Sequence, residues 1–185
     1  MRFTAIFYEP DGRITSVQKN ATENVVGDRT YIKADFDGDP DDFYVSSGKV
    51  IFKGEKPSSA HVFDYNTGTW GFDLSAAKHE AWSMIKVARD IEEFGTFTWS
   101  SHTFQCDEIS QRRIQSAVQS AQLDSTVSVT WTLSDNTTQV FNATELQQIG
   151  QALSAHINAC HDKARAKRSE IDSATTEEQI NSVSW

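Results

Sequence analysis

The sequence predicts an α+β fold in which a small antiparallel β module, residues 1–73, precedes helices that alternate with two β-hairpins, residues 74–185. In the first part, turn residues at close intervals separate short runs rich in aromatic and β-branched side chains, a pattern typical of hairpins. In the second part, apolar residues recur at helical spacing through long segments, of which the last is the longest. With 38% hydrophobic and 23% charged residues, the 185-residue chain has the composition of a globular protein of one or two domains.

Three hairpins are expected in residues 1–73, and we expect them to join in one small antiparallel sheet. A sheet of this size has little core of its own, so it is expected to pack against another part of the structure. Turn chemistry separates the two arms of each hairpin. The arms are Arg2–Tyr8 with Ile14–Val17, Phe43–Val45 with Lys49–Phe52, and Val62–Tyr65 with Thr69–Phe72.

The second part is expected to open with a helix capped by Ser75 and closed by Gly95, because a hydroxyl suits an N-cap and glycine suits the position after a helix. An aromatic hairpin follows the helix, with arms at Thr96–Trp99 and Thr103–Cys106. The apolar residues of the helix recur at helical spacing and predict a single face. This face consists of Ala77, Ala81, Met84, Ile85, Ala88 and Ile91.

A second helix is expected after Asp107, whose carboxylate suits an N-cap. The segment Val127–Leu133 then alternates apolar with hydroxyl side chains, as a half-buried strand does, and a turn leads it back into Thr138–Phe141. The apolar stripe of the second helix consists of Ile114, Ala117, Val118 and Ala121.

Asn142 and Glu145 have the spacing of a capping box, which predicts the start of a long helix. Its apolar period near 3.6 continues to about Asp172, which corresponds to a length of roughly 45 Å. Beyond Cys160 the apolar stripe thins within a strongly charged segment. We therefore expect the first half of this helix to pack in the core, and the second half to project or to meet a partner.

A last short helix is expected after Thr175 or Thr176, and it leads to Trp185. Two interpretations of this tryptophan remain open: it packs against the core of its own domain, or it contacts a neighbouring chain. The core of the second part is expected to bring the hairpin aromatics together with the helical stripes. Its predicted members are Trp99, Phe104, Ile114, Val118, Trp131, Leu146, Ile149 and Leu153.

The net charge of −9 disfavours nucleic acid as a partner, because an acidic surface repels phosphate. No stretch approaches the ~20 apolar residues of a membrane span, and the first residues carry no secretory signal, so we expect no membrane partner. Cys106 and Cys160 stand without paired spacing, which favours free thiols and synthesis in a reducing cytosol.

Two groups of residues invite interpretation as a metal site, and neither has the spacing of a known module. The acidic run that begins at Asp35 has glycine at its fourth position and serine at its twelfth, whereas an EF-hand loop needs glycine at the sixth and glutamate at the twelfth. The segment His156–His161 holds too few zinc ligands, since its nearest complement is the distant pair His102 and Cys106. We therefore predict no metal and no other cofactor.

Catalytic motifs are also missing from the sequence. It contains no nucleophile elbow, no P-loop and no dinucleotide-binding glycine motif. Adjacent carboxylates such as Glu92 and Glu93 lie in helix turns, where neighbouring side chains do not face each other. Because no converging set of acid, base and nucleophile can be assembled, we predict that the protein is not an enzyme.

The most specific runs of the second part are FTWSSHTFQCDEISQRRIQ and WTLSDNTTQVFNATELQQIGQAL. With the segments around them, from Lys78 to Trp185, they resemble an uncharacterised domain of tailed bacteriophages that occurs in tail-fibre, baseplate and tail-fibre-assembly proteins. In the first part, DDFYVSSGKVIFKGEKPSSAHVFDYNTGTW resembles the opening segment of many phage tail and fibre-assembly proteins. The resemblance implies no catalytic residues. It implies a role in the phage tail.

This resemblance implies two alternative functions. In the first, the chain is a structural protein of the virion, acting as a fibre-base, baseplate or fibre-attachment adaptor; in the second, it is a chaperone of fibre assembly that leaves before the virion is mature. Both imply synthesis in the host cytoplasm and contacts with other tail or fibre proteins, and the symmetry of tails implies several copies. The candidate interface comprises the exposed face of the N-terminal sheet with Lys163, Arg165, Lys167, Arg168, Ile171 and Trp185.

Overall fold

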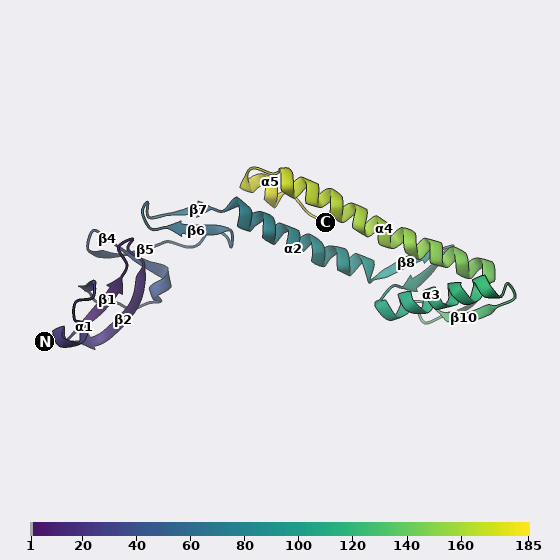
Figure 1. The fold of residues 1–185 in the computed structure, drawn as a ribbon, viewed down its shortest axis with the longest axis horizontal. Helices are drawn as coiled ribbons and strands as arrows, with labels where there is room; N and C mark the ends of the chain where they lie inside the picture. The colour runs from purple at the N-terminus through teal and green to yellow at the C-terminus, as the bar shows by residue number, and fades with distance from the viewer. Residues whose placement is uncertain (1) are drawn as a thin grey trace. The chain divides into compact units, whose positions relative to one another are not determined.

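A computed structural model describes residues 2–185, and it shows an α+β fold with antiparallel strand pairs (Figure 1). The chain forms two compact units, Met1–Ala76 and Ala77–Trp185. The division falls in the first turn of helix α2, Leu74–Glu93, close to the boundary expected from the sequence. Hydrophobic clusters form within each unit, so each has a core of its own.

The first unit contains three separate antiparallel sheets rather than the single sheet expected. Strand β1 is central in a three-stranded sheet of order β2-β1-β3, and the other strands form two hairpins. The elements are β1 (Phe3–Tyr8), β2 (Ile14–Ala21), α1 (Glu23–Val26), β3 (Tyr31–Lys33), the 3-10 turn η1 (Pro40–Asp42), β4 (Phe43–Ser46), β5 (Lys49–Phe52), β6 (His61–Asp64) and β7 (Thr69–Phe72).

Aromatic rings, instead of a continuous hydrogen-bond ladder, connect the hairpins of the first unit. The first sheet meets β4 through an isolated bridge between Arg13 and Tyr44. The ring centroid of Tyr44 lies 5.0 Å from that of Phe63 on β6, which in turn lies 5.2 Å from that of Trp70 on β7. The prediction of one sheet was wrong because each hairpin pairs its own backbone groups, while side-chain packing joins the hairpins.

Strand β1 supplies the core of the first sheet on both of its faces. Ala5 and Phe7 pack with residues of β2 and α1 on one side. Ile6 packs with Ile14 and Val45 on the other side. This alternation follows from strand geometry, in which successive side chains point to opposite faces.

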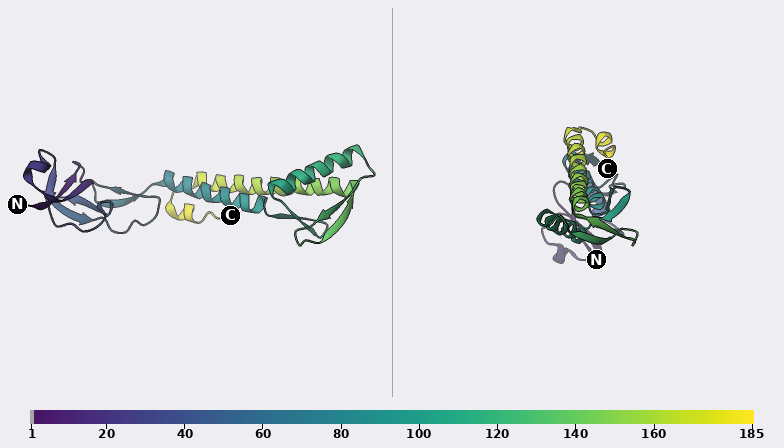
Figure 2. Two further views of the ribbon diagram at one scale, coloured as in Figure 1. Left: turned by 90° about the horizontal axis from the view of Figure 1, so that it is seen from below. Right: turned by 90° about the vertical axis from the view of Figure 1, so that its right-hand side faces the viewer.

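In residues 77–185, all of which are described, four helices and two hairpins make up the second unit (Figure 2). Their ranges agree with those predicted to within a few residues. The elements after α2 are β8 (Thr96–Trp99), β9 (His102–Gln105), α3 (Glu108–Leu123), β10 (Ser128–Thr132), β11 (Thr138–Asn142), α4 (Ala143–Ser173) and α5 (Glu177–Asn181).

Side-chain caps begin α3 and α4 where the sequence predicts them. The carboxylate of Asp107 accepts two backbone N–H groups in the first turn of α3, at 2.9 and 3.0 Å. At α4 the Asn142 side chain accepts the N–H of Glu145 at 3.0 Å, and the Glu145 carboxylate accepts the N–H of Asn142 at 2.8 Å. This reciprocal pair is a capping box, and it satisfies donors that a helix start otherwise leaves open.

The ends of α2 differ from the prediction. Asp73, and not Ser75, accepts the N–H of Ala76 at 3.0 Å, because the helix begins one residue before the serine. Gly95 follows the helix without the positive φ of a left-handed cap. Its carbonyl accepts the N–H of Cys106 at 3.0 Å, so it ties the end of α2 to the β8–β9 hairpin.

The core of the second unit lies between its two hairpins, α3 and the first half of α4. All eight residues predicted for this core belong to one cluster, with Trp99, Val118 and Trp131 at its partly buried margin. Phe104 is completely buried, and Phe141 almost so. The buried members outside these eight are Phe97, Cys106, Ala121, Leu133, Phe141 and Ala143.

Helices α2 and α4 lie side by side in opposite directions (Figures 1 and 2). The expectation that the second half of α4 projects was wrong, because Cys160, Ala164 and Ile171 are buried. The paired residues follow antiparallel order: Lys78 with Asp172, Trp82 with Arg168, and Glu92 with Lys163.

Candidate protein-interaction surface

The α4 segment predicted as an interface lies against α2 within the second unit. Ile171 has no exposed surface, so its prediction as an interface residue was wrong. The guanidinium of Arg168 lies 5.2 Å from the ring centroid of Trp82 on α2, where the face of the indole attracts a cation. Lys167 and Arg165 form ion pairs with acidic residues one turn away on α4. The basic residues of this segment therefore have partners within the helix pair.

The carboxylate of Glu92 accepts hydrogen bonds from a side chain of α4 and from the last residue of the chain. Its Oε2 accepts a hydrogen bond from Lys163 Nζ at 3.0 Å and another from Trp185 Nε1 at 2.6 Å. The same Nζ lies 4.2 Å from the Trp185 ring centroid. The bond from Lys163, followed by that from Trp185, holds the pKa of Glu92 below its ordinary value. Of the two interpretations left open for Trp185, the structure shows packing within its own unit.

The histidines considered as zinc ligands have other partners. Nε2 of His156 lies 3.1 Å from a backbone carbonyl oxygen at the end of α2. Nε2 of His161 lies 3.2 Å from Oε2 of Glu93, a carboxylate that is largely buried. The ring of His102 packs edge-on against Phe141, with centroids 5.5 Å apart. These contacts join the helices and hairpins of the second unit to one another.

Both cysteines lie in the interior. Burial raises the pKa of the Cys106 thiol to about 11, and it raises that of Cys160 as well. A thiol with a raised pKa stays protonated at neutral pH, and the protonated form is neither a good nucleophile nor a metal ligand. Among the described residues no group of three or more His, Cys, Asp or Glu side chains is placed to hold a metal ion.

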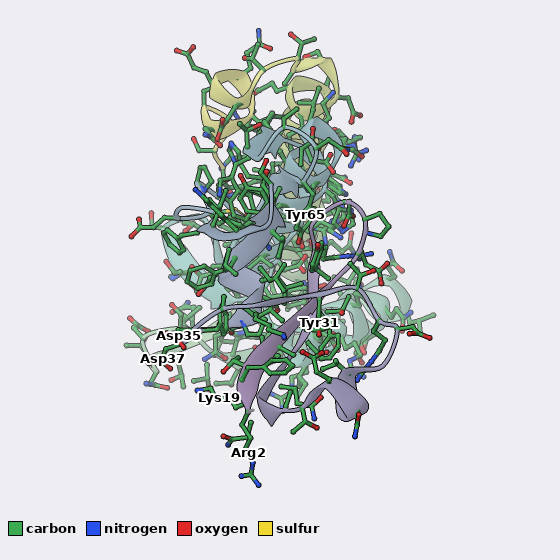
Figure 3. The ribbon with its side chains drawn as sticks, turned by 90° about the vertical axis from the view of Figure 1, so that its left-hand side faces the viewer. Arg2, Lys19, Tyr31, Asp35, Asp37 and Tyr65 are labelled. Carbon is green, nitrogen blue, oxygen red and sulfur yellow. The ribbon has the colours of Figure 1, made fainter. Side chains whose placement is uncertain are left out.

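The acidic run lies on the outside of the first unit, where Figure 3 shows Asp35 and Asp37 near Lys19. The carboxylate of Asp37 is 3.9 Å from Lys19 Nζ, and its side chain is fully exposed. Asp39 caps the short turn η1 by accepting the N–H of Asp41 at 3.0 Å. The run therefore forms a solvated, capped turn ahead of β4.

Helix α2 exposes a row of apolar side chains that was not predicted as a surface. Met84, Val87 and Ile91 of α2 and Phe94, which directly follows it, are 67%, 58%, 71% and 39% exposed. They succeed one another at spacings of three, four and three residues, so they form one line along the helix. We call these four residues the α2 seam. A shallow hollow lined by Glu80, Ser83, Met84, Val87, Ala88 and Ile91 follows it.

The residues of α2 that contact α4 lie on the other side of the helix. Trp82 and Glu92 contact side chains of α4, and Ile85 between them is buried. At 3.6 residues per turn, these positions lie about half a turn from the α2 seam. The single apolar face predicted for this helix was therefore wrong, because its residues divide between a buried side and an exposed one. The spacing of three, four and three was the signal that could have separated them.

The fold and the α2 seam together define an α+β protein with an apolar helix face that is open in this chain. More particularly, residues 76–184 match the model of the family described as Domain of unknown function (DUF4376), and the chain belongs to that family. The match spans α2 to α5 and thus includes the α2 seam. No curated protein and no solved structure matches the chain. Within residues 2–185, no helix has the length and apolar character needed to cross a membrane.

Proposed function

We propose that this protein is a structural component of a bacteriophage tail, a fibre-base, baseplate or fibre-attachment adaptor that acts through protein–protein contacts and not through catalysis. The α2 seam is the observation that carries the proposal. Contiguous apolar surface that stays exposed on a folded domain is typical of interaction sites. The resemblance of FTWSSHTFQCDEISQRRIQ and WTLSDNTTQVFNATELQQIGQAL to phage tail proteins supports the tail as the place of work.

The polar chemistry of the second unit also favours a contact role. Glu92 is engaged with Lys163, and Glu93 lies beside His161, so these groups connect α2 to α4. The thiols are buried and protonated. An active site instead needs an acid, a base or a nucleophile that converge on space open to a substrate.

Mass spectrometry of gradient-purified phage particles tests the proposed location. We expect the chain in the particles, in a fixed ratio to the other tail proteins and in several copies per tail. If infected lysate contains the chain but purified particles do not, the virion role is wrong, and the alternative role of an assembly chaperone takes its place.

A pair of matched variants tests whether the α2 seam is the contact surface. Val87→Glu places a carboxylate in the seam, and Leu123→Glu places one at the end of α3, on a residue that is 90% exposed. Both positions are exposed, so both variants are expected to keep the fold. We expect particles from the Val87→Glu phage to contain far fewer copies of the chain, and those from the Leu123→Glu phage to contain the normal number. Equal incorporation of the two variants would remove the seam from the proposal.

A further inference from the structure

The α2 seam fits a second copy of the same chain. We propose that α2 associates with the α2 helix of another copy along Met84, Val87, Ile91 and Phe94, so that the protein forms an assembly of at least two chains. This inference rests on the part of the proposed function that makes the seam a contact surface, and it names the partner.

The spacing of the seam indicates that a helix covers it. Alternating steps of three and four residues give an average period of 3.5, and this period keeps a row of side chains facing a neighbouring helix. An extended peptide places side chains on one face at every second residue, so it does not match this row. The occupant of the seam is therefore a helix with a similar repeat.

Among the described helices, the matching row is that of α2 itself. Ile109 and Leu123, the exposed large apolar residues of α3, lie at its opposite ends and form no line. The apolar stripe of α4 is buried within its own unit. The complement that this chain offers is therefore the α2 seam of a second copy, in a contact where the same surface serves both sides.

The charges beside the seam also favour self-association. The chain carries a net charge of −9, so contacts between copies are opposed by repulsion at most places on the surface. Ala81, Ser83 and Ala88 beside the seam are small and uncharged, whereas Glu80, one turn before Met84, adds a carboxylate at the N-terminal end of the row. The nearby carboxylate of Asp90 is held by Arg89 at 2.5 Å. In a two-fold contact with the two α2 helices antiparallel, the two Glu80 carboxylates lie at opposite ends, so the copies can approach along Met84–Phe94 without bringing these like charges together.

The size of the seam sets the expected strength of the contact. From Met84 to Phe94 the row spans about 15 Å of helix. A contact this short buries less than the ~1,600 Å² of a standard interface, so association of the purified chain is expected to depend on concentration. Copies held side by side in a tail would associate more readily, because tethering raises their effective concentration.

Sedimentation velocity of the purified full-length chain, over a wide range of concentrations, tests the inference. We expect the mass to rise from that of one chain to that of two or more. Val87→Glu and Ile91→Lys, which add charges of opposite sign, are each expected to weaken association by at least about tenfold, because a charge in an apolar contact loses its hydration. Leu123→Glu is expected to associate as the wild type does. Circular dichroism melts check that each variant is folded.

Several results would overturn the inference. These are a single-chain mass for the wild type at every concentration, association of both seam variants at wild-type strength, and equal weakening by Leu123→Glu. The measurement uses the chain alone, so it is independent of the particle experiment. A chain found in particles but monomeric in isolation contradicts only this inference, whereas a chain that associates but is absent from particles contradicts only the tail location.

Discussion

Phe104 occupies the centre of the core of the second unit. Its ring is completely buried, and its centroid lies 5.2 Å from that of Phe97 and 5.6 Å from that of Phe141. Trp131 lies farther out, with its centroid 6.3 Å from that of Phe104, and it is only partly buried. The difference in burial predicts a difference in how strongly each ring stabilises the fold, since the free energy follows the apolar surface removed from water.

We predict that Phe104→Ala destabilises the protein by about 3–5 kcal/mol, and that Trp131→Ala costs less. The buried ring leaves a cavity that its neighbours fill incompletely, whereas the marginal ring already contacts water. Urea unfolding of the two variants measures both costs, and Val140→Ala, at an exposed strand position, serves as the control. A cost for Trp131→Ala equal to or above that for Phe104→Ala would contradict this picture of the core.

Features set by neighbours in sequence could be predicted at the residue scale, and features set by distant neighbours could not. Asn142 and Glu145 are three residues apart, so their capping box is visible in the sequence alone. Ile171 is completely buried although the residues around it in the sequence are charged, and the nearest printed contact, between Asp172 and Lys78 of α2, joins residues 94 apart. Phe141 was missed for a similar reason, because the alternation of the short strand β11 does not reveal that α4 and the β8–β9 hairpin enclose it.

At the scale of elements, Gly150 sets how closely α3 and α4 approach. A Cβ atom at this position would lie 2.5 Å from Cγ2 of Val118 on α3, which is too close for two carbon atoms. Valine is stiff about χ1 in a helix, so it cannot readily turn away. The glycine therefore stays in the middle of a helix despite its poor helix propensity.

We predict that Gly150→Ala destabilises the protein, although alanine is favoured over glycine in a helix by about 1 kcal/mol. The clash with Val118 is expected to cost about 1–3 kcal/mol, which exceeds that gain. In a Val118→Ala background the clash is absent, so there the same Gly150→Ala change is expected to stabilise. Thermal melts of the two single variants and the double variant measure this reversal. Stabilisation by Gly150→Ala alone would show that the helices separate without cost.

The contact between Glu92 and Lys163 predicts a dependence of stability on pH. Because the folded state lowers the pKa of Glu92, its ionised form stabilises the fold above the ordinary value of 4.5, and this contribution is lost as the pH falls through the lowered pKa. We predict that Glu92→Gln lowers the melting temperature at pH 7, and that its difference from the wild type shrinks below about pH 4. Melts between pH 7 and pH 3 measure the difference, and a difference that stays constant would contradict the role of the charge.

The pairing of α2 with α4 shows why sequence periodicity was insufficient at this scale. In α2, polar side chains such as Lys78 and Glu92 lie on the inward side, where they contact α4. The large apolar residues Met84 and Ile91 lie on the outward side. A rule that turns every large apolar residue of a helix to the core therefore misplaces Met84 and Ile91, although it places Ile85 correctly. A helix with partners on both sides breaks that rule, and self-association through the α2 seam would account for it.

At the scale of the whole molecule, the two units have separate cores, and this separation predicts independent unfolding. Ile6 is completely buried in the first unit, as Phe104 is in the second. We predict two calorimetric transitions. Ile6→Ala is expected to lower the midpoint temperature of one, and Phe104→Ala that of the other. Each substitution is expected to cost about 2–5 kcal/mol in its own unit. A single transition that both variants shift equally would show that the units unfold together.

Asn142 is both the last residue of β11 and the N-cap of α4, so no loop separates the strand from the helix. The β10–β11 hairpin is therefore joined directly to the 31-residue helix, which is about 45 Å long. A rotation of the hairpin by about 5° that carried the whole helix with it would move the far end of the helix by about 4 Å. Lys163 of α4 and Trp185 both donate hydrogen bonds to Glu92 of α2. These bonds hold α4 beside α2 and oppose its bending. A small change in the angle of the β10–β11 hairpin would thus displace the C-terminal end of α4 by about the size of an atom.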